Sequence, residues 1–234
     1  LAVPGKHTMC LFADAPHGTG KECVTVWVPA LVMTLAASPS EMFPDQAVLD
    51  VSGSVVYNHG ALGAALPVTV TMDGVSGSFE TVTDASGRFF LNLPGPGRPG
   101  TYKIRAAVSD SHGLLAQSAI SVIVRAKKIS LTLNLDPAET LPLKSVRVEG
   151  IAIYEDSMPM VNREVAIEIE ETRKRHFALT GLSGEFALQI ESPSTPGDYN
   201  IHAEVSDTFS RAEALAKLTV LSEPIDLTER LMPP

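Results

Sequence analysis

Apolar and polar residues alternate along most of the chain, with the two-residue period of a strand that buries one face. Turn-forming sequences such as Asp84–Gly87 and Pro94–Gly97 separate the alternating runs. In the first half of the chain the pattern predicts seven strands, at about 31–37, 47–57, 66–73, 78–83, 88–93, 101–109 and 115–124. Seven short strands of this spacing are typical of an antiparallel β-sandwich, so we expect an all-β protein.

One segment departs from the alternation. Phe209, Ala212, Leu215 and Leu218 have helical spacing. Their counterpart in the first half, Leu114–Val124, has the pattern of a strand. We therefore expect a strand here too, with a helical turn near 210–214.

The stretch from Gly53 to Asp110 recurs 97 positions later without a gap. Gly53 matches Gly150, and Tyr57 matches Tyr154. At the same offset, Ser86-Gly87 matches Ser183-Gly184, Tyr102 matches Tyr199 and Asp110 matches Asp207. Self-similarity at one fixed offset indicates duplication of a structural unit. We expect two tandem sandwiches, at 30–125 and 126–221, followed by a tail or linker at 222–234.

A third, partial copy precedes them. Pro4-Gly5 resembles Pro99-Gly100, and Val26 and Val28 fall opposite Val122 and Val124. Residues 1–29 are therefore expected to be the C-terminal hairpin of a partial repeat whose front is missing. A lone two-stranded hairpin is marginal in water, so it must pack on the next domain, pair with another chain or belong to a longer protein. Strand exchange between copies would build a filament.

Several short motifs follow one another along the first full copy. They are a small-residue strand that ends near Gly53, the Thr-Asp-x-x-Gly-x-Phe hairpin at 83–89, Pro-Gly-x-Tyr at 99–102 and Val-Ser-Asp at 108–110. Together they resemble the modular immunoglobulin-like (Ig-like) and carboxypeptidase-regulatory-like (transthyretin-like) domains of prokaryotic surface and secreted proteins. The resemblance covers nearly the whole chain and implies a fold rather than a function.

The resemblance also implies a tyrosine corner, in which a tyrosine hydroxyl bonds the backbone upstream. Tyr102 and Tyr199 stand at that position in the two full copies. His7 stands there in the partial copy, which is a departure from the pattern.

Composition and charge exclude several classes of protein. Hydrophobic residues make up 44% of the chain, enough to build cores and to exclude global disorder. A net charge of −9 argues against nucleic acid or an anionic membrane as the main partner. The most apolar stretch, Val24–Ala37, is interrupted by Pro29 and is shorter than the roughly 20 residues of a membrane-spanning helix.

Cys10 and Cys23 are the only cysteines. They fall on adjacent predicted strands of the partial copy, so a cross-strand disulfide is reasonable. A disulfide would imply an oxidising compartment, and hence a secreted or cell-surface protein. The alternative is two reduced, buried cysteines in a cytosolic protein.

Asp14, Asp110 and Asp207 recur at one turn of the repeat. They are candidates for calcium, which needs six to eight oxygen ligands at one point. A short carboxylate at a turn more often accepts a hydrogen bond from the amide two residues on, and we favour that interpretation. We expect no metal site and no cofactor.

Arg173, Lys174, Arg175 and His176 form the only dense basic run. It is a candidate contact for an acidic protein or a polyanionic glycan. The alternative, which we favour, is a solvated hairpin tip whose charges discourage sheet-to-sheet pairing.

The sequence contains no Gly-x-Ser-x-Gly elbow, no phosphate-binding glycine loop and no His-x-x-x-His pair. We therefore expect no catalytic residues. The favoured function is a non-catalytic structural or adhesive segment of a larger extracellular or cell-surface protein, with a filament or surface assembly as one form. Its partners would be other protein chains or copies of itself. The alternatives are a glycan- or protein-binding module, or accessory domains of a secreted hydrolase.

Overall fold

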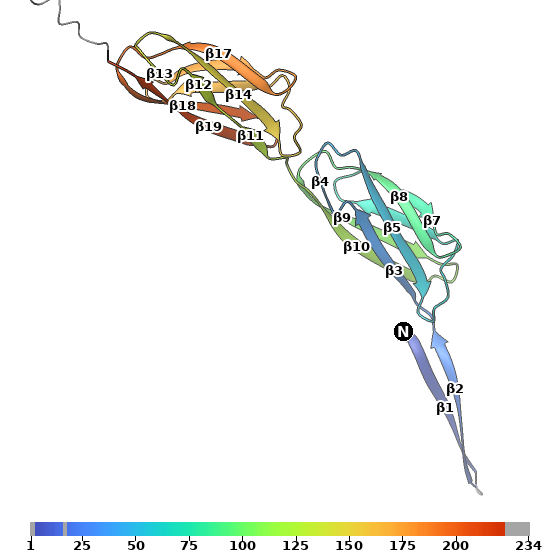
Figure 1. Cartoon of the computed structure of the whole chain (residues 1–234). Helices are drawn as coiled ribbons and strands as arrows, with labels where there is room; N and C mark the ends of the chain where they lie inside the picture. The colour runs from blue at the N-terminus through green and yellow to red at the C-terminus, as the bar shows by residue number, and fades with distance from the viewer. Residues whose placement is uncertain (1–2, 16–17, 223–234) are drawn as a thin grey trace, which may run out of the picture. The chain divides into compact units, whose positions relative to one another are not determined.

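The computed structural model describes residues 3–15 and 18–222 and divides the chain into two compact units, Leu1–Arg125 and Ala126–Pro234. The described residues are strands, turns and loops without a helix (Figure 1). The predicted class, all-β with tandem sandwiches, is confirmed.

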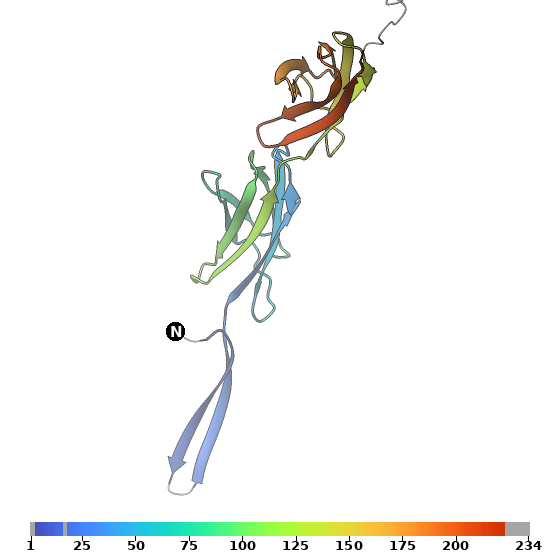
Figure 2. The same ribbon diagram turned by 90° about the vertical axis from the view of Figure 1, so that its left-hand side faces the viewer.

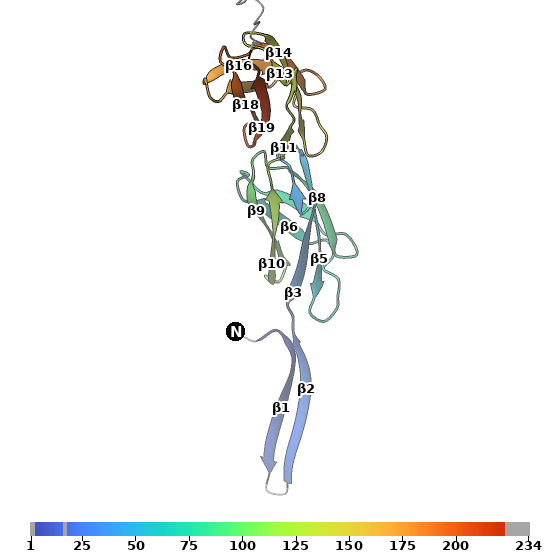
Figure 3. The same cartoon turned by 60° about the vertical axis from the view of Figure 1, so that its left-hand side comes forward.

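The first unit begins with a two-stranded antiparallel hairpin, β1 (Gly5–Ala15) and β2 (Gly18–Val28), which is seen as a ribbon in Figure 2. A sandwich of two sheets follows, with strand orders β3-β5-β8 and β4-β10-β9-β6-β7, which lie as two layers in Figure 3. Its strands are β3 (Leu31–Ser38), β4 (Glu41–Met42), β5 (Val48–Tyr57), β6 (Pro67–Met72), β7 (Phe79–Val82), β8 (Arg88–Pro94), β9 (Gly100–Ser109) and β10 (Leu115–Val124).

All strand pairs in this sandwich are antiparallel except one. The short strand β4 runs parallel to β10, where Ile123 N–H donates to the Ser40 carbonyl at 3.0 Å and Arg125 N–H donates to the Met42 carbonyl at 3.0 Å. β4 is absent from the seven predicted strands because two residues are too few to show an alternation.

The second unit repeats this arrangement. One sheet has the order β13-β19-β18-β15-β16, with β13 parallel to β19, and in the other β14 pairs with β11, β12 and β17. Its strands are β11 (Ile129–Leu131), β12 (Asn134–Asp136), β13 (Glu139–Thr140), β14 (Ser145–Tyr154), β15 (Glu164–Ile169), β16 (Lys174–Leu179), β17 (Glu185–Glu191), β18 (Gly197–Ser206) and β19 (Arg211–Val220).

Each sandwich has its own core of fully buried aliphatic side chains, for example Val70 and Ile104 in the first and Ile167 and Ile201 in the second. In one sheet of each sandwich, a glycine in the central strand (Gly53 in β5, Gly150 in β14) makes room for a phenylalanine ring. A Cβ on Gly53 would lie 2.5 Å from the Phe89 ring and 2.2 Å from the Thr34 carbonyl oxygen. The absence of a side chain there lets the phenylalanine pack against the strand.

The expected helical turn near 210–214 is wrong, because β19 begins at Arg211 and pairs with β18 along its whole length. Its inward side chains follow a period of two, ending in the buried Leu218 and Val220, whereas Leu215 is 65% exposed. The apparent helical spacing arose because small alanines occupy most of the inward positions and Leu215 faces out.

The predicted tail or linker at 222–234 lies outside the described residues from residue 223 onward. Within the part of the chain that the structure describes, no helix is long and apolar enough to cross a membrane.

Candidate functional site

The two tyrosines of the predicted corners make the same contact. The Tyr102 hydroxyl donates to the Arg98 carbonyl at 2.9 Å, and the Tyr199 hydroxyl donates to the Thr195 carbonyl at 2.8 Å. Each bond spans four residues and ties the start of its strand to the loop before it. These tyrosines therefore serve the scaffold.

A second tyrosine, which the sequence analysis did not single out, makes a longer link. The Tyr57 hydroxyl donates to Asp110 Oδ2 at 3.1 Å, joining β5 of one sheet to the β9–β10 turn of the other. Asp110 Oδ1 also accepts the amides of His112 and Leu114, each at 2.9 Å. Burial alone would raise the pKa of Asp110, but these hydrogen bonds outweigh it and lower the pKa below its ordinary value.

The second unit repeats the arrangement with Tyr154 and Asp207. The Tyr154 hydroxyl donates to Asp207 Oδ2 at 2.9 Å, and the amides of Phe209 and Ser210 donate to Oδ1 at 2.8 and 2.7 Å. Burial acts to raise the pKa of Asp207, and the hydrogen bonds from Phe209, Tyr154 and Ser210 lower it overall.

The three aspartates proposed as calcium candidates are not brought together. Asp110 and Asp207 bind groups of their own turns, while Asp14 is an exposed residue on β1 opposite Thr19. Over residues 3–15 and 18–222, no three His, Cys, Asp or Glu side chains are grouped so that they could hold a metal ion.

Cys10 and Cys23 face each other across β1 and β2 and form a disulfide, with their Cα atoms 4.0 Å apart. On the same face of the hairpin, the Lys21 ammonium lies 5.2 Å from the centre of the Phe12 ring. The disulfide thus locks the register of a ribbon that has only two strands.

The basic run at 173–176 does not form one surface. Arg173 lies in the turn before β16, with a positive φ of 55°, and Arg175 pairs with Glu168 on β15 at 2.6 Å. Successive strand residues face opposite sides, so His176 is turned inward, and its Nε2 is buried without a hydrogen-bond partner. Burial, with the nearby Lys174 charge, lowers the pKa of His176. The four residues named as a candidate contact are therefore divided between two faces.

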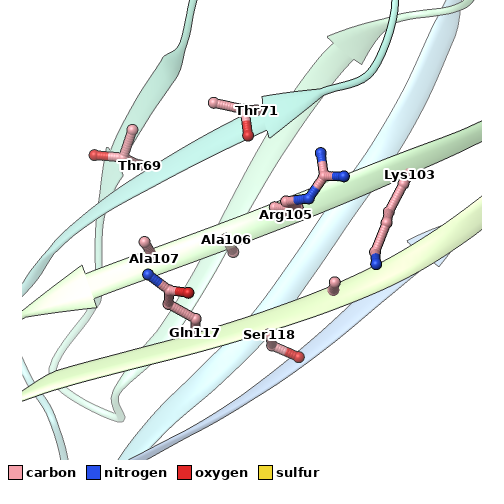
Figure 4. Close-up of a pocket in the computed structure, with 9 residues that line it drawn as sticks. Thr69, Thr71, Lys103, Arg105, Ala106, Ala107, Gln117 and Ser118 are labelled. Carbon is pink, nitrogen blue, oxygen red and sulfur yellow. The ribbon is translucent and has the colours of Figure 1, made fainter.

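A shallow groove of about 460 Å³ crosses the outer face of β6, β9 and β10 in the first unit. Figure 4 shows threonine, lysine, arginine and glutamine side chains around a floor that includes Ala107. Its polar lining consists of Thr69, Thr71, Lys103, Arg105, Gln117 and Ser118. Arg105 is held by Asp73 at 2.5 Å. Hydroxyl and amide groups can donate and accept hydrogen bonds, and cationic groups form charge-assisted bonds with anions.

The corresponding face of the second unit is different. Glu204 takes the place of Ala107, and Glu213 takes the place of Gln117. Both glutamates are bridged by Arg211 at 2.8 Å, so larger, charged side chains cover the sheet there. The two units therefore share interior contacts and differ on this surface.

Two further links were missed from the sequence because their partners are distant along the chain. The buried Thr83 hydroxyl donates to the Gly63 carbonyl at 2.6 Å and accepts the Leu66 amide at 2.8 Å. Thr180 makes the equivalent pair of bonds with Met160 and Arg163 in the second unit. The threonines recur at the offset of the repeat, which is the signal that could have identified them.

No protein-family model matches the chain, and no curated protein matches it either. Among solved structures, it is 15% identical to the adhesin InvE of Yersinia pseudotuberculosis (80% of this chain, 59% of that one, TM-score 0.39). It is 15% identical to invasin, a bacterial integrin-binding protein (83% and 40%, TM-score 0.44), and 14% identical to the titin domains Z1Z2 solved with telethonin (84% and 98%, TM-score 0.42). The chain thus spans less than two thirds of the first two proteins.

The strand orders define the class: this is an all-β protein of tandem Ig-like sandwiches. The narrower resemblance to carboxypeptidase-regulatory-like domains is not confirmed.

Proposed function

We propose that the chain is a non-catalytic structural or adhesive segment of a larger cell-surface or secreted protein. This proposal rests on the interior hydrogen bonds that the two units have in common. The Tyr57–Asp110 pair and the buried Thr83 are repeated at equivalent positions in the second unit, whereas the outer sheet faces differ. A duplicated catalytic site would need its surface groups repeated, while a duplicated scaffold needs only its interior.

The Cys10–Cys23 disulfide supports a location outside the cytoplasm, because disulfides persist in oxidising compartments. Other protein chains on the same surface are the partners that such a segment would meet.

The parallel pairing of β4 with β10 suits a segment under tension. The chain enters the sandwich through β3 and β4 and leaves it through β10. Pulling on the two ends therefore slides β4 along β10, so the Ile123–Ser40 and Arg125–Met42 hydrogen bonds must break together rather than one by one. The second unit has the equivalent parallel pair, β13 and β19. There the Thr219 amide donates to the Ala138 carbonyl and the Leu221 amide donates to the Thr140 carbonyl.

Single-molecule force spectroscopy of the whole chain tests this role. Ile123→Pro removes one of the amide donors to the β4 segment and should lower the unfolding force of the first unit alone. Thr219→Pro is the matched control and should lower the force of the second unit alone. Unchanged forces in both variants would contradict a role in bearing tension.

The groove on β6, β9 and β10 favours a second candidate, an acidic-glycan-binding module. Lys103 and Arg105 would meet the carboxylates or sulfates, and the threonines and Gln117 would meet the hydroxyls. A glycan array with the double variant Lys103→Glu/Arg105→Glu tests it. Arg173→Glu makes the same kind of charge change outside the groove. Binding that survives the double variant, or that is never detected, rejects this candidate.

A further inference from the structure

One face of the β1–β2 hairpin carries four exposed apolar side chains, next to Glu22, which pairs with Leu11. Paired residues on neighbouring strands point to the same side. Met9 pairs with Val24 and lies two residues from Leu11, while Val26 pairs with His7, so these side chains share one face. Met9 is 64% exposed, Leu11 75%, Val24 62% and Val26 39%. The opposite face carries the disulfide, the Lys21–Phe12 contact and Trp27, whose ring centroid lies 6.5 Å from that of His59. A contiguous exposed apolar face of this kind marks a surface that another element covers.

The hairpin has the register of the last two strands of each sandwich. Its closing pair, Gly5–Val28, matches Gly100–Val124 of β9–β10 and Gly197–Val220 of β18–β19. In this register Met9 corresponds to Ile104, and Val26 corresponds to Val122. Ile104 and Val122 are fully buried against the second sheet of their sandwich. The apolar face of the hairpin thus consists of core positions.

The corner contact agrees with this correspondence. His7 occupies the place of Tyr102, and its Nε2 contacts the Val3 carbonyl, four residues upstream. Tyr102 and Tyr199 contact the carbonyls four residues upstream of themselves. The departure from tyrosine noted in the sequence therefore keeps the contact and changes only the side chain.

The strand edges complete the comparison. In the sandwiches, the outer edge of β9 pairs with β6 and that of β10 with β4, and β18 and β19 pair likewise with β15 and β13. In the part of the chain that the structure describes, β1 and β2 pair only with each other. In both sandwiches the equivalent two edges pair with further strands, and the equivalent face packs against a second sheet. The hairpin has neither of these among the described residues.

We infer that the hairpin is the docking surface for the remaining strands of a third Ig-like sandwich, and that these strands lie N-terminal to Leu1 in the same polypeptide. Their sheet would cover Met9, Leu11, Val24 and Val26, and a strand equivalent to β6 would pair with the free edge of β1. The strand equivalent to β8 would end close to Leu1, because only residues 95–99 separate β8 from β9. The third sandwich would be present whether or not the protein is adhesive.

A second copy of the chain fits this surface less well. Both of its sandwiches already contain their own last two strands, so it could offer only its own hairpin. Two strands of 11 residues present a face of roughly 350 Å², from a rise of about 3.3 Å per residue and a strand spacing of about 4.8 Å. Stable dimers bury about 800 Å² on each partner. Strands in the same polypeptide need no such area, because the covalent link supplies their proximity.

The test compares the 234-residue chain with the natural polypeptide extended N-terminally by about one repeat, by amide hydrogen exchange and mass spectrometry. We expect amides of β1 and β2 to exchange on the order of a thousandfold more slowly in the extended protein, as slowly as those of β9 and β10. Leu11→Asp should abolish this protection, and Thr8→Asp, on the opposite face, should leave it. In the 234-residue chain neither variant should change the exchange of the hairpin.

Three results would overturn the inference. One is a hairpin that exchanges equally fast in both proteins. Another is an encoded upstream sequence that is missing or lacks alternating strands. The third is a 234-residue chain that dimerises in sedimentation equilibrium and is made monomeric by Leu11→Asp but not by Thr8→Asp, which would assign the face to a second copy.

Discussion

Tyr57 and Asp110 stand 53 residues apart and are joined by a hydrogen bond from the phenol to the carboxylate, and Tyr154 and Asp207 repeat the bond at the same separation. Each pair connects the two sheets of its sandwich at a turn. The carboxylate also holds the amides of that turn, so one side chain organises both the turn and the packing of the sheets.

Removing the hydroxyl should destabilise only one unit. Tyr154→Phe should cost the second sandwich about 1.5 kcal/mol, because a hydrogen bond to a charged group is lost. Hydrogen exchange read separately on the two units measures it, and Tyr57→Phe should give the reciprocal pattern. Equal destabilisation of both units by either variant would refute the assignment.

Stability should fall on acidification. The folded-state pKa of Asp110 and of Asp207 lies below the unfolded value of about 3.9, so their contribution is complete above that pH and is lost as pH falls through the folded pKa. Thermal unfolding between pH 7 and pH 2 should show this loss. Asp110→Asn/Asp207→Asn should be less stable at pH 7 and flatter over the acidic range. An unchanged acid slope in the double variant would show that other groups cause it.

Gly53 and Gly150 should not accept a side chain. Gly53→Ala should cost about 2 kcal/mol or more, because the new Cβ meets both the Thr34 carbonyl and the Phe89 ring. Gly97→Ala is the matched control, since nothing lies within 4 Å of its Cβ position. Urea titration compares the two variants, and a neutral Gly53→Ala would mean that the ring can move aside.

Loss of the disulfide should affect the hairpin and spare the sandwiches. Cys10→Ser/Cys23→Ser removes the cross-link between β1 and β2. For a loop as short as the one from Cys10 to Cys23, such a cross-link contributes about 3 kcal/mol to the pairing of the two strands. Amides of β1 and β2 should exchange faster, while the melting temperatures of both sandwiches stay the same. A lowered melting temperature of the first sandwich would show that the hairpin stabilises it.

The alternation of apolar residues predicted the strands, and the 97-residue offset predicted the tandem sandwiches, because both signals are local or repeated. The pairing of Tyr57 with Asp110 depends on how distant turns meet, which no local pattern contains. The arrangement of the basic run at 173–176 could not be predicted for a related reason. A run of like residues in a strand is divided between two faces, and only the structure places His176 inside. The groove likewise depends on the small size of Ala107 and Ala119, a feature with no sequence signature of its own.

The parallel β4–β10 pair also fixes where the chain enters and leaves a sandwich. Entry and exit lie at opposite poles, so a whole unit could be inserted into or deleted from the gene without rewiring its neighbours. Gain or loss of one unit would then leave the fold of the other unchanged, while each outer face could diverge independently.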